Sequence, residues 1–91
     1  MKFKSYKYRI SGVVQGVYYR KSVQAEASRL GYSGYVKNMS DGSVEACVTC
    51  NEEALEDFIQ ILKAGSSASR VDHIELLECH EHFEKGFEIR Y

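Results

Sequence analysis

The sequence predicts an α+β fold of the split βαβ type, with elements in the order β-α-β-β-α-β and a short C-terminal strand after them. Three observations support this prediction. Five short segments have the apolar-polar alternation or the apolar composition of strands. In two further segments the apolar residues recur every three or four positions, as they do on one face of a helix. An Asp-Gly pair at positions 41–42 predicts a tight turn, and therefore a hairpin, between two of the strands.

The first strand and the first helix lie on either side of a glycine-flanked loop. Residues 6–11 alternate apolar and polar side chains, which places Tyr6, Tyr8 and Ile10 on one face of a strand. Residues 12–16 break this pattern. A helical period begins at Arg20, and Gly31 stands where a helix commonly ends. The apolar residues with helical spacing are Val23, Ala27 and Leu30.

A hairpin and a second helix follow. Residues 33–38 and 43–50 are expected to be strands, joined by a turn at residues 39–42. Asn51 is suited to cap the second helix, because its side-chain oxygen can accept a hydrogen bond from a free backbone N–H. Lys63 and Gly65 mark the end of that helix. Its apolar stripe consists of Leu55, Phe58, Ile59 and Leu62.

The last third of the chain completes the fold. Residues 65–69 are a Gly/Ser-rich loop, and residues 71–79 and 87–91 are expected to be strands. The result is a ferredoxin-like split βαβ sandwich, an antiparallel sheet with two helices on one face. No linker or repeat divides the 91 residues, so residues 1–91 are expected to form a single domain. This fold hosts many functions, and it therefore does not predict an activity.

Composition excludes several classes of function. Lys and Arg number 12 against 13 Asp and Glu, a net charge of -1, so no nucleic acid is expected as a partner. An RNA-binding reading of Tyr6 and Tyr8 as stacking residues is disfavoured for the same reason. Apolar stretches are only a few residues long, so no membrane is expected either. Three cysteines without a secretory signal favour a cytoplasmic location.

The cysteines include a C-x-x-C pair, Cys47 and Cys50, which raises the question of a metal or redox site. Three steps along a strand place the two side chains on opposite faces, about 10 Å apart, so they can neither bridge nor share a metal. Residues 79–82 (Cys-His-Glu-His) add ligand types, but at a spacing that fits no tetrahedral site. No metal and no cofactor are therefore expected.

The segment of residues 11–20 joins the first strand to the first helix and is suited to bind an anion. Gly12 and Gly16 allow the backbone to approach a ligand closely, and the first N–H groups of a helix have no intrahelical acceptor. Arg20 adds a planar, permanently charged guanidinium that matches two phosphate oxygens. On pattern alone, a simple turn with a solvated arginine explains these residues about as well.

Two motifs resemble those of the acylphosphatases. The family has a V-x-G-x-V-Q-G-V-x-F-R signature, and residues 10–20 here are I-S-G-V-V-Q-G-V-Y-Y-R. A second signature, G-W-V-x-N followed by D-G-x-V-E, corresponds to G-Y-V-K-N at residues 34–38 and D-G-S-V-E at residues 41–45. Tyr19 and Tyr35 replace a Phe and a Trp of the family and keep an aromatic ring. The resemblance covers nearly the whole chain.

This resemblance implies an acylphosphatase, a hydrolase that converts an acyl phosphate to a carboxylate and inorganic phosphate. Arg20 and Asn38 correspond to the two catalytic positions of the family. The phosphate is expected to bind to the loop that runs from Gln15 through Gly16, Val17, Tyr18 and Tyr19 to Arg20, and Asn38 is expected to orient a water for in-line attack. The partners expected are a small-molecule acyl phosphate and inorganic phosphate, as product and competing ligand, and the protein is expected to be a monomer.

Two alternatives remain open from the sequence. Asn38 ends a strand, and an Asn in that place commonly bonds its own backbone. The same loop could also belong to a non-catalytic module that binds a phosphate-bearing ligand without turnover.

Overall fold

The predicted order of strands and helices is present in the structure, a computed structural model that describes residues 3–91. A single 3-10 turn, Glu52–Ala54, precedes the second helix. The two helices are short, and neither is long and apolar enough to cross a membrane. The elements are β1 (Phe3–Val13), α1 (Tyr19–Arg29), β2 (Ser33–Asn38), β3 (Val44–Asn51), α2 (Leu55–Ala64), β4 (Arg70–Leu77) and β5 (Phe87–Arg90).

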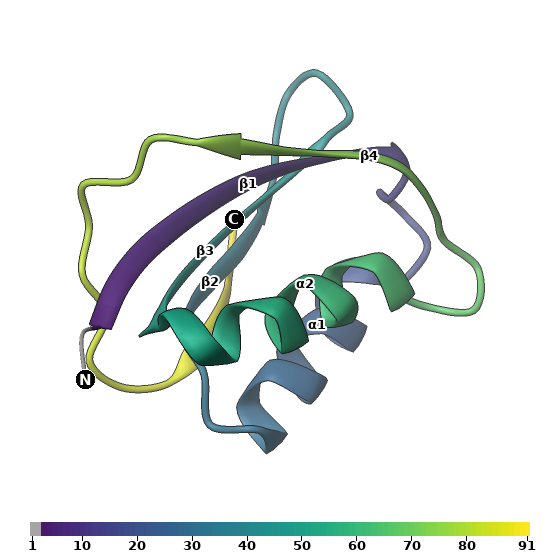
Figure 1. The fold of residues 1–91 in the computed structure, drawn as a ribbon. Helices are drawn as coiled ribbons and strands as arrows, with labels where there is room; N and C mark the ends of the chain where they lie inside the picture. Colours follow the sequence, from purple (N-terminus) through teal and green to yellow (C-terminus); the bar gives the residue numbers. More distant parts are fainter. Residues whose placement is uncertain (1–2) are drawn as a thin grey trace.

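The five strands form one sheet in the order β4-β1-β3-β2-β5. β1 pairs antiparallel with both β3 and β4, and β2 pairs antiparallel with β3. The sheet is mixed rather than wholly antiparallel, because β5 lies parallel to β2. Both helices lie on one side of the sheet (Figure 1). The ferredoxin-like split βαβ fold is therefore confirmed.

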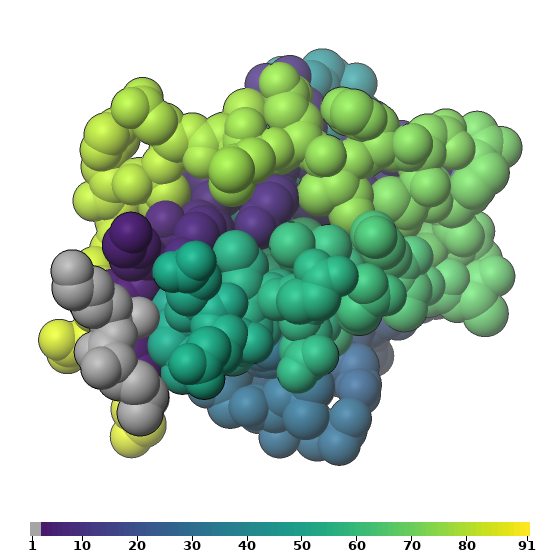
Figure 2. Space-filling model, in the orientation of Figure 1, coloured from purple at the N-terminus to yellow at the C-terminus, as the bar shows by residue number. Residues whose placement is uncertain are grey.

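The core lies between the sheet and the helices. The strands contribute alternate residues, among them Tyr8 and Ile10 of β1, and the helices contribute Val23, Phe58 and Leu62. In Figure 2 the atoms of α2 (teal) lie in the middle of the face in view, with those of β4 (green to lime) above them and those of α1 (blue) below. Burying these side chains is the main favourable contribution to folding in a domain of this size.

The helix stripes differ from prediction at Leu30 and Ile61, and Tyr19 of α1, outside the predicted stripe, is also buried. Leu30, expected on the apolar face of α1, is 49% exposed, because the helix ends at Arg29 and Leu30 leaves it with φ -91° and ψ 1°. Ile61 of α2 is buried although it was not in the predicted stripe. The two helices therefore bury slightly different faces from those that spacing alone predicts.

β1 extends further than predicted and bends before it enters the loop. Its pairing with β4 shifts register between Ser11 and Gly12, which is a β-bulge. A Cβ atom on Gly12 would lie 2.1 Å from the carbonyl oxygen of Arg70, so only glycine allows β4 to approach this closely. The bend turns the chain toward the glycine-flanked loop.

Candidate active site

A cavity of about 390 Å³ opens at the end of the sheet where β1 and β2 terminate. Because both strands pair antiparallel with β3, they run in the same direction, and their C-terminal ends lie at the same end of the sheet. The cavity is lined by Val14, Gly16, Tyr18, Tyr19, Arg20, Lys21, Asn38, Ile89 and Tyr91. Three segments therefore supply its walls: residues 14–21, the end of β2 and the C-terminal residues Ile89 and Tyr91.

The cavity brings together most of the site residues expected from the sequence. Arg20 and Asn38 both line it, together with Gly16, Tyr18 and Tyr19. Gln15 and Val17 belong to the same loop but are not part of the lining. Sequence reasoning missed Val14, Lys21, Ile89 and Tyr91, and of these only Lys21, directly after Arg20, carried a signal, its positive charge.

The loop before α1 has an unusual backbone. Gly16 has φ 71°, and Tyr18, directly before α1, has φ 62° and ψ 20°. A left-handed conformation is uncommon for a residue other than glycine and costs about 1–3 kcal/mol, and such residues concentrate at functional sites. The Tyr18 side chain is 76% exposed, so its own packing does not impose this conformation.

The amide groups of this loop are available to a ligand. Within residues 3–91, none of the backbone N–H groups from Gln15 to Arg20 donates a hydrogen bond to a protein acceptor. The first N–H groups of α1 add the positive end of the helix dipole at the same place. A curled loop with several unused donors is the arrangement that binds phosphate groups in many proteins.

Four hydrogen bonds to other parts of the fold hold the loop in place. The side-chain nitrogen of Gln15 donates to the carbonyl oxygens of Met39 and Ser43 in the β2–β3 hairpin, at 2.8 Å each. The hydroxyl of Ser66 donates to the carbonyl oxygen of Val17. The hydroxyl of Tyr19 donates to the carbonyl oxygen of Leu62 at 2.7 Å, and burial raises the pKa of Tyr19, which keeps this donor protonated.

Arg20 lies in the first turn of α1, with its guanidinium at the cavity. One nitrogen, Nη1, donates to the carbonyl oxygen of Arg90 at 3.3 Å, and the guanidinium lies 4.9 Å from the centre of the Tyr91 ring. Within residues 3–91, Arg20 forms no ion pair with a carboxylate. Its charge is therefore not neutralised by the protein, and most of its N–H groups are available to an anion.

Asn38 ends β2 and presents an unsatisfied acceptor. Its Oδ1 atom is buried and has no hydrogen-bond partner among residues 3–91. Within the described residues, this oxygen therefore does not accept a hydrogen bond from the hairpin backbone, whereas the side chain of Asp41 does. Asp41 accepts hydrogen bonds from the hydroxyl and the backbone N–H of Ser43, which hold the pKa of Asp41 below its usual range.

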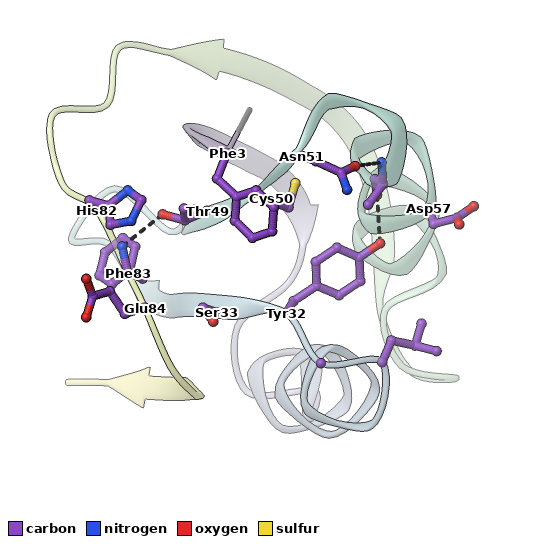
Figure 3. Close-up of a pocket in the computed structure, with 13 residues that line it drawn as sticks. Phe3, Tyr32, Ser33, Thr49, Cys50, Asn51, Asp57, His82, Phe83 and Glu84 are labelled. Atoms are coloured by element: carbon purple, nitrogen blue, oxygen red, sulfur yellow. Dashed lines mark hydrogen bonds between the residues drawn. The ribbon is translucent and has the colours of Figure 1, made fainter. Parts of the chain in front are cut away.

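A second cavity, of about 500 Å³, lies at the opposite end of the sheet (Figure 3). Its walls carry the aromatic rings of Phe3, Tyr32 and Phe83 and the acidic groups of Asp57 and Glu84. Among residues 3–91, two carboxylates and no Lys or Arg line this cavity, so these residues are unsuited to bind a phosphate. Within residues 3–91, no group of three or more His, Cys, Asp or Glu side chains is arranged to hold a metal ion.

The fold and the first cavity define a small α+β sandwich domain that brings Arg20 and the buried Oδ1 atom of Asn38 into one cavity at one end of the sheet. The family model for acylphosphatase matches residues 6–89. The chain is 44% identical over 82 residues to an acylphosphatase of Acidovorax sp. (strain JS42), covering 90% of this chain and 84% of the relative. It is 46% identical over 84 residues to an acylphosphatase of Aeropyrum pernix, covering 90% of this chain and 83% of the relative.

The crystal structure of acylphosphatase from Bacillus subtilis has the same fold. It matches this chain with a TM-score of 0.86 and 36% sequence identity, over 99% of this chain and 100% of that one. The chain therefore belongs to the acylphosphatase family, a family of hydrolases, and the resemblance seen in the two sequence motifs is confirmed.

Proposed function

We propose that this acylphosphatase hydrolyses small acyl phosphates to a carboxylate and inorganic phosphate. In this proposal the loop from Gln15 to Arg20 and the Arg20 guanidinium bind the phosphate, and Asn38 orients the water that attacks phosphorus. Residues 1–91 act as a single domain and as a monomer, and inorganic phosphate competes with the substrate as the product of the reaction.

One observation carries the proposal: the Oδ1 atom of Asn38 is buried, has no hydrogen-bond partner in the part of the chain that the structure describes, and belongs to a residue that lines the same cavity as Arg20. A buried acceptor left without a hydrogen bond costs about 1–3 kcal/mol, so the fold tolerates a cost that a bound water would remove. A water that donates one hydrogen to Oδ1 directs its lone pair elsewhere. With a phosphate on the nearby loop, that direction is toward phosphorus.

The chemistry of an acyl phosphate matches what the cavity contains. The leaving group is a carboxylate, which departs without a proton, so a strong general acid is not needed. Phosphoryl transfer depends mainly on positioning and on stabilising the charge of the phosphoryl oxygens. Unused backbone N–H groups and the Arg20 guanidinium provide both, because they are held in place before the substrate arrives.

The proton of the attacking water needs an acceptor other than Asn38. A carboxamide does not titrate near neutral pH, so Asn38 can orient the water but cannot take its proton. Within residues 3–91, no His, Asp or Glu side chain lines the cavity. We infer that a phosphoryl oxygen of the substrate takes the proton.

The proposal is tested by measuring hydrolysis of benzoyl phosphate by the purified protein, with and without a metal chelator. We expect release of benzoate and phosphate above the spontaneous rate, at the same rate in both conditions, with competitive inhibition by inorganic phosphate. Phosphate binding without turnover would instead support a non-catalytic binding module. No phosphate binding and no turnover would overturn the assignment of the cavity.

A further inference from the structure

Two cysteines from distant parts of the chain meet on the face of the sheet that carries no helix. The sulfur atoms of Cys47 and Cys79 lie 2.8 Å apart, although the residues are separated by 32 positions. Cys47 is buried in the middle of β3, and Cys79 is half-buried just after the end of β4. The two sulfurs need to approach by only about 0.8 Å to reach the length of a disulfide bond.

The third cysteine does not compete for this pairing. Cys50 is buried in the core between the sheet and the helices, on the opposite face of β3 from Cys47. Cys47 and Cys50 therefore cannot form a disulfide with each other, as the alternation of side chains along a strand predicts. The partner of Cys47 is brought to it by the fold and not by the local sequence.

Cys79 is held near Cys47 by its own segment. Residues 78–86, here called the crossover segment, connect β4 at one edge of the sheet to β5 at the other. The backbone N–H of Phe83 donates to the Thr49 hydroxyl of β3 at 2.9 Å (Figure 3). The Phe83 ring packs edge-on against Tyr35 of β2, with ring centres 5.5 Å apart.

A further contact fixes the same segment from β5. Glu81 pairs with Arg90 at 3.5 Å, and the Arg90 guanidinium lies over the Tyr35 ring, 4.0 Å from its centre. Cys79 thus lies near the start of the crossover segment, whose middle contacts β3, β2 and β5. The closeness of the two sulfurs follows from this packing.

We propose that Cys47 and Cys79 are a modification site, at which a small-molecule disulfide such as oxidised glutathione oxidises the two thiols to an intramolecular disulfide. The Cys79 thiolate attacks one sulfur of the oxidant, forms a mixed disulfide and releases one reduced thiol. Cys47 then loses its proton and attacks the Cys79 sulfur, which releases the second reduced thiol. The protein gives up two protons and two electrons, and the oxidant becomes two thiols.

The different environments of the two thiols set the order of these steps. Cys79 is partly exposed and can reach a dissolved oxidant, whereas Cys47 is buried under the crossover segment. Burial raises the pKa of the Cys47 thiol, and its contact with Cys79 raises it further. Once Cys79 is in a mixed disulfide, it no longer carries a negative charge that opposes ionisation of Cys47, so the second step becomes easier.

The bond stabilises the fold and leaves the active site unchanged. It closes a chain loop that contains α2 and β4, and a loop of this length is expected to raise the Tm by roughly 10–20 °C. Neither cysteine lines the cavity of Arg20 and Asn38. Hydrolysis at temperatures where both forms are folded is therefore expected to be the same in the oxidised and the reduced protein.

The experiment compares the full chain after dithiothreitol with the full chain after oxidised glutathione. Free thiols are counted in denaturant, intact mass is measured, and Tm is recorded for each form. The reduced protein has three free thiols. We expect the oxidised protein to have one, to be lighter by two hydrogen atoms, to remain monomeric and to melt at the higher temperature.

Two variants test the assignment. Cys50→Ala is expected to lose both remaining thiols and to keep the full Tm difference between its oxidised and reduced forms. Cys79→Ser changes a half-buried position and is expected to fold, and its oxidised form should show no rise in Tm. The proposal is overturned by a glutathione adduct or a covalent dimer as the final product, by three remaining thiols, by Cys79→Ser forming an intramolecular disulfide, or by equal Tm values in the two forms.

Discussion

The side-chain nitrogen of Gln15 lies 2.8 Å from the carbonyl oxygen of Met39, the residue that directly follows Asn38. The same nitrogen lies 2.8 Å from the carbonyl oxygen of Ser43, across the hairpin turn. The backbone N–H of Met39 also donates to Ser43, at 2.8 Å, so the two carbonyls belong to one small bonded unit. Gln15 therefore connects the loop of Arg20 to the hairpin that carries Asn38.

Replacing Gln15 is expected to lower turnover without changing a residue that lines the cavity. In Gln15→Leu both hydrogen bonds to the hairpin are lost, and each is worth about 1 kcal/mol. We expect kcat to fall about tenfold, with a smaller change in KM, and Tm to fall by roughly 5–10 °C. Steady-state kinetics and thermal unfolding measure these effects.

Gln24→Leu is the matched control for this variant. Gln24 also donates from its side chain to a backbone carbonyl, that of Phe87 at 3.2 Å, but it does not line the cavity. We expect Gln24→Leu to change Tm and to leave kcat unaltered. Equal losses of kcat in the two variants would show that Gln15 contributes only to general stability.

Asn38→Ala is expected to lower kcat by about two orders of magnitude while phosphate inhibition stays nearly the same, because the side chain orients water and does not hold the phosphate. The variant should be at least as stable as the parent, since Asn38 Oδ1 makes no hydrogen bond with any of residues 3–91 that could be lost. Activity, the inhibition constant of phosphate and Tm are the three measurements. A large fall in Tm, or unchanged kcat, would contradict the assigned role.

Arg20→Ala is expected to lower kcat/KM by about 10²–10³-fold and to weaken inhibition by phosphate. Arg20→Lys keeps the charge but loses the planar fork, so an intermediate loss is expected. Arg29→Ala is a control with the same change of charge on the same helix, where Arg29 pairs with Glu26 at 2.7 Å. If Arg29→Ala weakened phosphate inhibition as much as Arg20→Ala, the effect would be one of net charge alone.

Stability is expected to fall as the pH rises above about 10, the ordinary pKa of tyrosine in an unfolded chain. Burial raises the pKa of Tyr8 to about 12 and also raises that of Tyr35, which donates to Glu45 at 2.6 Å. Because the folded pKa values are the higher ones, these groups add stability that is fully present below the unfolded pKa and is lost as the pH passes toward the folded pKa.

Urea unfolding of the parent and of Tyr8→Phe at several alkaline pH values tests this expectation. The midpoint should decline with pH in both proteins, and less steeply in Tyr8→Phe, which has one buried phenol fewer. Parallel declines in the two proteins would show that Tyr8 ionises equally in the folded and unfolded states.

Local signals in the sequence were sufficient for the elements and for the central site residues. Alternation and helical spacing located β1, α1 and the β2–β3 hairpin, because those patterns follow from which face each element buries. The two motifs identified Arg20 and Asn38, and the structure brings both to one cavity. Their roles in the reaction stay predictions until the variants are measured.

Features that depend on contacts between distant segments could not be predicted. The neighbour of Cys47 is decided by how residues 78–86 cross the sheet, and nothing near Cys47 in sequence encodes that path. The side chain of Gln15 was expected in a phosphate-binding loop, but its bonds go to the hairpin, which only the packing of the two segments reveals. The left-handed backbone conformation of Tyr18 could not be predicted from the sequence either, because tyrosine does not favour that conformation.

The order of strands in the sheet has a consequence for how the chain reaches this structure. Both neighbours of β1 come from much later in the sequence, β3 at Val44–Asn51 and β4 at Arg70–Leu77. The interstrand hydrogen bonds of β1 can form only after long loops have closed. The chain therefore loses conformational entropy before strand pairing stabilises it. Refolding is therefore expected to be slow for a chain of this size. Until β3 and β4 pair with β1, its unpaired backbone groups can pair with the wrong strand.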